Sequence, residues 1–243
     1  MRRAKIIALI ALMAFPGGGA GQAQSLQVSP VTVDLPPLSR STFLTVANGT
    51  GEPVQVQVRV FRWSLVDGQD KLERTGDVVV SPPMLTARRG EGNVVRIIRI
   101  AQAPVACEEA YRVFVEEIPS RKRVQAATIV LAVRHSIPVF FSGVDANRGS
   151  VNWSASSRNG KLVLVAGNPG QKHVRISHLR VTDGVARQLI AINGLAGYAL
   201  GGQARIWELP VSPGTLKPGT NLKIDAQSDV GPINASVVLG RSG

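Results

Sequence analysis

The residues able to do acid–base or metal chemistry are few, and their spacing keeps them apart. His173 and His178 are five residues apart, so on one strand they would face opposite sides, and His135 stands alone. The acidic residues include two adjacent pairs, Glu108–Glu109 and Glu116–Glu117. Neighbours on a strand point to opposite faces, so neither pair can work together as acid and base. The histidine spacing favours ordinary surface or edge histidines over a zinc site.

The glycine-rich stretches contain no motif for nucleotide binding or nucleophilic catalysis. No glycine cluster is followed by the Lys and Ser/Thr of a phosphate-binding loop, and no Gly-x-Ser-x-Gly turn occurs. The sequence therefore predicts a protein that is not an enzyme and that needs neither a cofactor nor a metal.

The single cysteine excludes stabilisation by an intramolecular disulfide, and the distribution of charge bears on whether the protein binds nucleic acid. Cys107 cannot form an intramolecular disulfide, and its position in a predicted loop favours a spectator thiol. The formal net charge of +12 is spread over single residues and pairs, with one short run at residues 121–123. Without interleaved aromatic residues or a helix to carry them, these charges favour a solvated surface over a nucleic-acid site.

The N-terminus has the pattern of a secretory signal. Three basic residues between positions 2 and 5 precede an apolar run from Ile6 to Phe15, and small residues follow. This pattern predicts a signal peptide over residues 1–23 that is cleaved near Gln24. The apolar run is about half as long as a membrane-spanning helix needs to be, and no later stretch reaches that length, so we expect no membrane insertion.

Short stretches of alternating apolar and polar residues dominate the rest of the chain. Val54 to Val60 alternates strictly, which predicts a strand with one covered and one solvated face. Turn-forming residues separate such stretches, and the pair Pro82–Pro83 predicts a cis bond before one of the two prolines. The pattern predicts an all-β fold of two tandem immunoglobulin-like β-sandwich domains, residues 24–143 and 144–243, joined by a polar linker.

The segment from Thr128 to Phe141 is long for a strand and carries Ile129, Leu131 and Val133 on one face. One interpretation is a buried central strand, because both faces are partly apolar. The other is an exposed edge that lends its alternating side chains to the open groove of another protein. The basic loop at residues 120–123 suits a strand that stays unpaired until a partner arrives.

The motifs around this strand resemble those of the periplasmic chaperones of the chaperone–usher pilus pathway. The Glu-Ile-Pro element at 117–119 and the long strand ending in Ile-Pro-Val-Phe-Phe at 137–141 carry the resemblance most specifically. The Ser-Pro-Pro-Met segment at 81–84 is similar to the Pro-Pro turn of the family, and Gly-Asn-Pro at 167–169 is similar to a strand start in its second domain. The resemblance covers nearly all of residues 25–243.

The resemblance implies a boomerang of two immunoglobulin-like domains with the long strand at the cleft. In that family the strand completes an incomplete pilus or fimbrial subunit, a step called donor-strand complementation, and the subunit passes to an outer-membrane usher. On this basis Ile129, Leu131 and Val133 are the donated side chains, and the protein resides in the periplasm.

One departure from the family pattern concerns the site that holds the C-terminal carboxylate of the subunit. Typical members use an Arg on the first strand and a Lys on the donor strand, but the matching positions here hold Thr32 and Pro138. The short opening strand and the Ser-Ile-Pro-Val-Phe strand end look more like the archaic branch, which is associated with spore-coat-U-like subunits. Arg112 and Arg134 are the candidates for a relocated anchor, because an Arg fork suits a carboxylate. The alternative for each is an exposed edge cation.

Two other classes of protein share this strand pattern. A structural pilus subunit or adhesin of β-sandwich fold would carry an N-terminal donor extension, whereas this chain starts its first strand almost at the predicted cleavage site. A carbohydrate-binding sandwich would show an aromatic platform. Trp63, Trp153 and Trp207 are scattered singly, which favours core packing instead.

Overall fold

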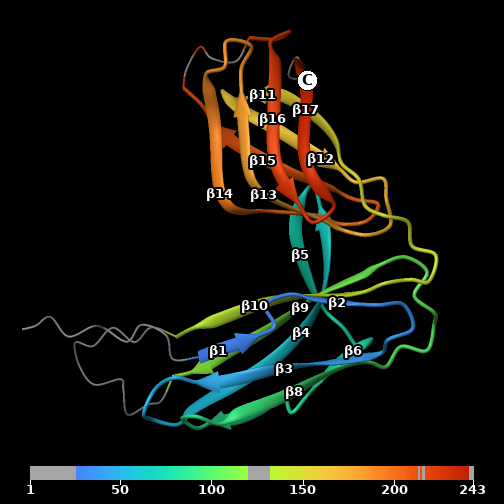
Figure 1. Ribbon diagram of the computed structural model, residues 1–243, viewed down its shortest axis with the longest axis vertical. Coiled ribbons are helices and arrows are strands. Elements are labelled where there is room, and N and C mark those ends of the chain that lie inside the picture. The colour runs from blue at the N-terminus through green and yellow to red at the C-terminus, as the bar shows by residue number, and fades with distance from the viewer. Residues whose placement is uncertain (1–25, 120–131, 213, 215–216, 241–243) are drawn as a thin grey trace, which may run out of the picture.

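The computed structural model describes residues 26–119, 132–212, 214 and 217–240, which form two β-structured lobes joined at an angle (Figure 1). Within these residues all regular structure is β-strand, and no helix there could cross a membrane. The strands of the N-terminal lobe are β1 (Leu26–Ser29), β2 (Val33–Leu35), β3 (Ser41–Asn48), β4 (Val54–Val66), β5 (Gln69–Arg74), β6 (Val78–Ser81), β7 (Met84–Ala87), β8 (Gly92–Arg99), β9 (Glu109–Ile118) and β10 (Arg134–Phe141). Those of the C-terminal lobe are β11 (Asn152–Arg158), β12 (Lys161–Gly167), β13 (Val174–Thr182), β14 (Gln188–Ala199), β15 (Ala204–Pro210), β16 (Asn221–Ser228) and β17 (Gly231–Gly240).

The N-terminal lobe packs two sheets around one core. One sheet has the strand order β1-β3-β8-β6, and the other has the order β2-β10-β9-β4-β5 with β7 also paired to β4. The alternation predicted for β4 is present, because Val54, Val56 and Val58 are buried in this core while Gln55 is exposed. The sequence pattern thus dictates which face of each strand the sandwich covers.

Two cis peptide bonds lie where the chain crosses from one sheet to the other. Ser29–Pro30 is cis and lies between β1 and β2, which belong to opposite sheets. Ser81–Pro82 is also cis and joins β6 of the first sheet to β7 beside β4 in the second. The prediction of a cis bond in the Pro-Pro turn is confirmed.

The C-terminal lobe is a single run of seven paired strands in the order β14-β13-β16-β17-β11-β12-β15. Side chains from strands far apart in that order share one core, as Leu164 of β12, Ile176 of β13 and Leu222 of β16 show. The run therefore folds over itself into a second sandwich. The predicted all-β fold of two immunoglobulin-like lobes at an angle is confirmed.

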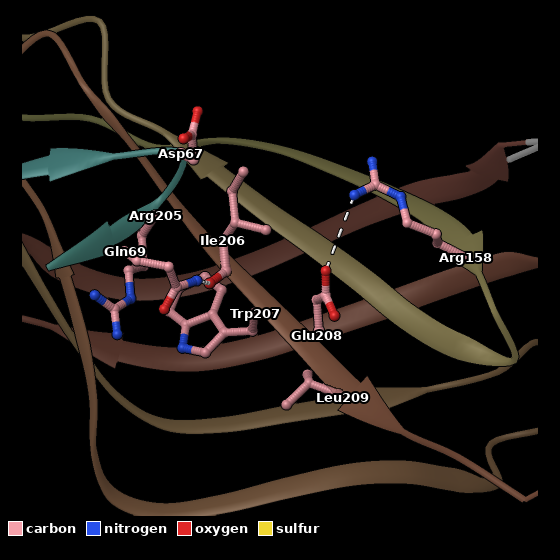
Figure 2. A pocket seen from close by; sticks show the side chains of 8 residues that line it. All are labelled: Asp67, Gln69, Arg158, Arg205, Ile206, Trp207, Glu208 and Leu209. Carbon is pink, nitrogen blue, oxygen red and sulfur yellow. Dashed lines mark hydrogen bonds and ion pairs between the residues drawn. The ribbon is translucent and has the colours of Figure 1, made fainter. Parts of the chain in front are cut away.

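The two lobes meet through apolar side chains and through a hairpin that reaches from one lobe to the other. Six buried residues form a small core between the lobes. They are Trp63, Leu65, Ala110, Phe140, Tyr198 and Leu200. The β4–β5 hairpin ends against β15, and Figure 2 shows Asp67 and Gln69 of the hairpin beside Ile206 of β15. There the Ile206 N–H donates to the Gly68 carbonyl at 3.1 Å. Gly68 has a φ of 72°, and a Cβ there would lie 2.2 Å from Ile206 Cγ1, so this contact requires glycine.

A buried histidine also ties the lobes together, which corrects the interpretation of His173 as a surface or edge histidine. Its ring is 8% exposed, stacks on Phe140 with centroids 3.6 Å apart, and places Nδ1 2.8 Å from Glu108 Oε1. Nε2 lies 3.3 Å from Asp229 Oδ2 and 3.7 Å from Asp34 Oδ1. The spacing of the histidines could not show this, because the carboxylates come from distant segments. No group of side chains among the described residues could hold a metal ion.

Candidate functional site

Strand β10 is paired on one edge along its whole length but only partly on the other. Its residues pair with β9 from Arg134 to Phe141, whereas β2 covers the opposite edge only from Val139 to Phe141. Along Arg134–Pro138 no described strand pairs with that edge, although the His135 ring lies 3.1 Å from the Leu26 carbonyl. The interpretation of an exposed edge is confirmed for this part of the segment. An open row of backbone groups can accept a strand from another chain.

Val133, the last of the three predicted donor residues, lies in line with the inward face of β10. Ile137, Val139 and Phe141 are buried in the core of the N-terminal lobe, and Val133 continues their alternation while being half-buried. The Glu117 N–H donates to the Val133 carbonyl at 3.0 Å, so pairing with β9 extends one residue beyond β10. Ile129 and Leu131 lie outside the described residues. The donor role of all three side chains stays a prediction.

The outward face of the same sheet opens into a cavity of about 360 Å³ between the lobes. Thr32 and Pro138 line it, so the two positions where the family pattern expects cations do face the cleft. Arg112 lines it too, because it is the cross-strand partner of Pro138. The remaining lining residues are Val31 and Ser136 from the N-terminal lobe, and Arg175, Ser177, His178, Gly194, Leu195 and Tyr198 from the C-terminal lobe.

Arg112 is a half-buried cation without a carboxylate partner among the described residues. Its guanidinium carbon lies 3.8 Å from the centroid of the Trp63 ring and 5.4 Å from that of Tyr198. Burial lowers the pKa of Arg112, which reflects the cost of removing an unpaired charge from water. The exposed Arg175 lines the same cavity from β13 of the other lobe. A site of this kind favours an anion with a planar, two-oxygen head such as a carboxylate.

The second candidate anchor, Arg134, does not join Arg112 in this cavity. It forms an ion pair with Glu116 on β9, and its guanidinium carbon lies 5.3 Å from the centroid of the Phe114 ring. Glu116 also pairs with Arg59 of β4. Arg134 is therefore already engaged, and it lies two residues before Ser136, outside the lining of the cavity.

Sequence reasoning missed the residues that support Arg112. Trp63 and Tyr198, which hold its guanidinium, come from β4 and from β14 of the other lobe. The sequence predicts that Trp63 packs in a core, and its buried ring does fill the core between the lobes. Nothing in the local sequence around Arg112 indicates these contacts, because the first depends on the register of β4 against β9 and the second on how the two lobes meet.

A comparison with known protein families matches the lobe that contains β9 and β10. A family model described as pili and flagellar-assembly chaperone, PapD N-terminal domain, matches residues 25–143, which contain β10, Arg112 and Arg134. No curated protein sequence matches the chain.

Solved structures of two-lobed chaperones share the fold over almost the whole chain. The CsuC–CsuE chaperone–tip adhesion subunit pre-assembly complex from archaic chaperone–usher Csu pili of Acinetobacter baumannii matches at 20% identity and a TM-score of 0.66, covering 90% of this chain and 100% of that one. The YadV chaperone matches at 17% identity and a TM-score of 0.62, covering 89% and 100%. The Salmonella enterica SafA pilin in complex with the SafB chaperone matches at 15% identity and a TM-score of 0.58, covering 91% and 98%. The fold is thus that of these proteins, and the N-terminal lobe, residues 25–143, belongs to the family of pili and flagellar-assembly chaperones, PapD N-terminal domain.

Proposed function

We propose that this protein is a periplasmic chaperone that captures pilus or fimbrial subunits by donor-strand complementation and delivers them to an outer-membrane usher. The observation that carries the proposal is the half-open edge of β10 beside a cleft that holds Arg112, an arginine without a carboxylate partner among the described residues. This is a binding role and not an enzymatic one. The family match also disfavours the alternative of a structural pilus subunit or adhesin.

The open edge supplies the physical basis for capture. A subunit that lacks one strand exposes an apolar groove and an unpaired sheet edge, both of which favour aggregation. In the proposed complex Ile129, Leu131 and Val133 fill the groove while the backbone of the same segment satisfies the edge. Burial of each aliphatic side chain in the groove contributes roughly 1.5–3 kcal/mol to the free energy of binding, so the three side chains together contribute several kcal/mol.

The cleft supplies an anchor for the chain terminus of the subunit. We assign this role to Arg112, since its guanidinium has no carboxylate partner among the described residues and faces the cavity lined by Thr32 and Pro138. Binding of a carboxylate there would neutralise a charge that burial now penalises. Arg134, already paired with Glu116, remains the second candidate.

Three further features belong to the same proposal. The signal peptide over residues 1–23 would direct the protein to the periplasm. The domains would comprise residues 24–143, including the donor strand, and 144–243. Assignment to the archaic branch is supported by Thr32 and Pro138 in the usual anchor positions and by the likeness of the fold to the archaic Csu complex.

The proposal is tested by co-expression of the protein with the secreted open reading frames that neighbour its gene. We expect one of these products to co-purify from the periplasmic fraction as a one-to-one complex and to aggregate or be degraded without the chaperone. Failure of every neighbouring product to bind, with the chaperone folded and exported, would contradict the proposed function.

Replacement of Arg112 by Gln should weaken subunit capture by about 10- to 100-fold, the loss expected for a hydrogen bond to a charged group. Removal of the terminal carboxylate of the subunit by amidation should have the same effect, and the two changes together should cost little more than either alone. Titration of the purified partners measures all four combinations. Arg180→Gln, at an exposed position of β13 outside the cavity, is the matched control and should bind normally. Full additivity of the two changes would remove Arg112 from the anchor role.

A further inference from the structure

Beside the cleft cavity, the same sheet face carries an arginine–phenylalanine patch that consists of Arg59, Phe61, Phe114, Glu116 and Arg134. Strand register places these side chains on one face. Arg59 pairs with Phe114 across β4 and β9, and Glu116 pairs with Arg134 across β9 and β10. The rings of Phe61 and Phe114 lie 5.4 Å apart between centroids. The guanidinium carbon of Arg59 lies 5.6 Å from the centroid of the Phe61 ring, and that of Arg134 lies 5.3 Å from the centroid of the Phe114 ring.

The patch carries a net positive charge. Glu116 is its single carboxylate and forms ion pairs with both Arg59 and Arg134. The Glu116 side chain is 13% exposed, whereas that of Arg134 is 60% exposed, so the cation faces solvent and the anion is covered. One carboxylate shared by two guanidinium groups leaves a net positive charge at the rim of the cleft. That charge attracts an acidic partner and repels a basic one.

The position of Arg134 on β10 places this charge at the open edge. A strand added to that edge would lie about 4.8 Å from β10, with side chains alternating between the two faces of the sheet. On the patch face Arg134 and Ser136 are the outermost exposed residues of β10. Side chains of the added strand on this face would come within about 5.5 Å of them, close enough for cross-strand pairs.

We propose that the patch selects the captured subunit by charge. The subunit strand that pairs with β10 carries Asp or Glu opposite Arg134 and an apolar side chain toward the Phe114 ring. This inference rests on the proposed function and names the chemistry of the partner. A carboxylate at that place gives Arg134 a partner of its own and frees Glu116 for Arg59, whereas a Lys or Arg there would face a guanidinium that Glu116 neutralises only in part.

Charge reversal in the complex with the co-purifying subunit tests the inference. Arg134→Gln should weaken capture about two- to fivefold and remove most of its dependence on NaCl concentration, whereas Arg134→Glu should weaken it at least tenfold and leave a repulsion that added NaCl relieves. Replacement of the facing acidic residue of the subunit by Lys should weaken capture by the wild type and restore it for Arg134→Glu. Arg180→Glu on β13 changes the net charge equally and should bind as the wild type does. Thermal melting of each free variant verifies that it is folded.

The outcomes separate the inference from the function beneath it. Wild-type capture and wild-type salt dependence in a folded Arg134→Glu variant would overturn charge selection while leaving donor-strand capture intact. Equal losses in the Arg134→Glu and Arg180→Glu variants would also overturn it, because net charge and not the patch would then be responsible. Absence of any captured subunit in the wild type would overturn the proposed function and this inference together.

Discussion

Replacement of Leu131 by Asp is expected to leave the protein folded and exported but to abolish recovery of its subunit. A carboxylate in an apolar groove must stay charged without a partner or take up a proton, and either costs several kcal/mol. In the free protein a side chain held ready for a partner meets water, so the same substitution costs little there. Leu131 lies outside the described residues, and the expectation rests on its alternation with the half-buried Val133.

Thermal melting of the purified variant, set beside the co-purification assay, distinguishes the two interpretations of this segment. A buried central strand forecasts the opposite result, because the carboxylate would then unfold the protein itself. Ala132→Asp is the matched control, since Ala132 is exposed and neighbouring side chains of an extended segment point to opposite faces. It should capture the subunit within a few-fold of the wild type. A Leu131→Asp variant with a normal melt and normal capture would show that Leu131 is not donated.

The fold was predictable because its signals are local. Strict alternation from Val54 to Val60 defines one covered face, and the structure buries that face in the N-terminal core. The Pro-Pro turn lies where the chain changes sheet, and its first peptide bond is cis as predicted. The start of the long strand was less predictable, since β10 begins at Arg134 while pairing continues to Val133. Apolar periodicity shows which residues can face a core but not where pairing with a neighbour stops.

The candidate site was predictable only in part, because its contacts join distant segments. Arg112 could be found from sequence, since it lies on a strand that the family pattern places beside the cleft. The Trp63 and Tyr198 rings that hold its guanidinium come from another strand and another lobe. Arg134 also has a guanidinium that could bind a carboxylate. It already forms an ion pair with Glu116, its cross-strand neighbour on β9. The residue types thus indicated that an arginine could bind a carboxylate. The sheet register decided which of the two arginines has no carboxylate partner among the described residues.

Raising the pH from 6.5 to above 9 is expected to lower the free energy of unfolding by about 3 kcal/mol through His173. Burial acts to lower the pKa of this imidazole, but hydrogen bonds with Asp229 and Glu108 outweigh burial and raise the pKa to about 9. In the unfolded chain the pKa returns to about 6.5. Each pKa unit corresponds to about 1.4 kcal/mol, which gives the expected total. Because the folded pKa is the higher one, this stability is fully present below pH 6.5 and is lost as the pH rises through 9.

Denaturant unfolding of the wild type and of His173→Gln at pH 6, 7.5 and 9.5 measures this contribution. The variant should be less stable at pH 6, where Glu108, Asp229 and Asp34 lose the cation between them, and the two proteins should converge at pH 9.5. His178→Gln, at an exposed position of β13, controls for the loss of an imidazole and should follow the wild type at every pH. Parallel curves for the wild type and His173→Gln would show that the pKa of His173 is the same in the folded and the unfolded protein. The lobes would then be held by stacking of His173 on Phe140 and not by its charge.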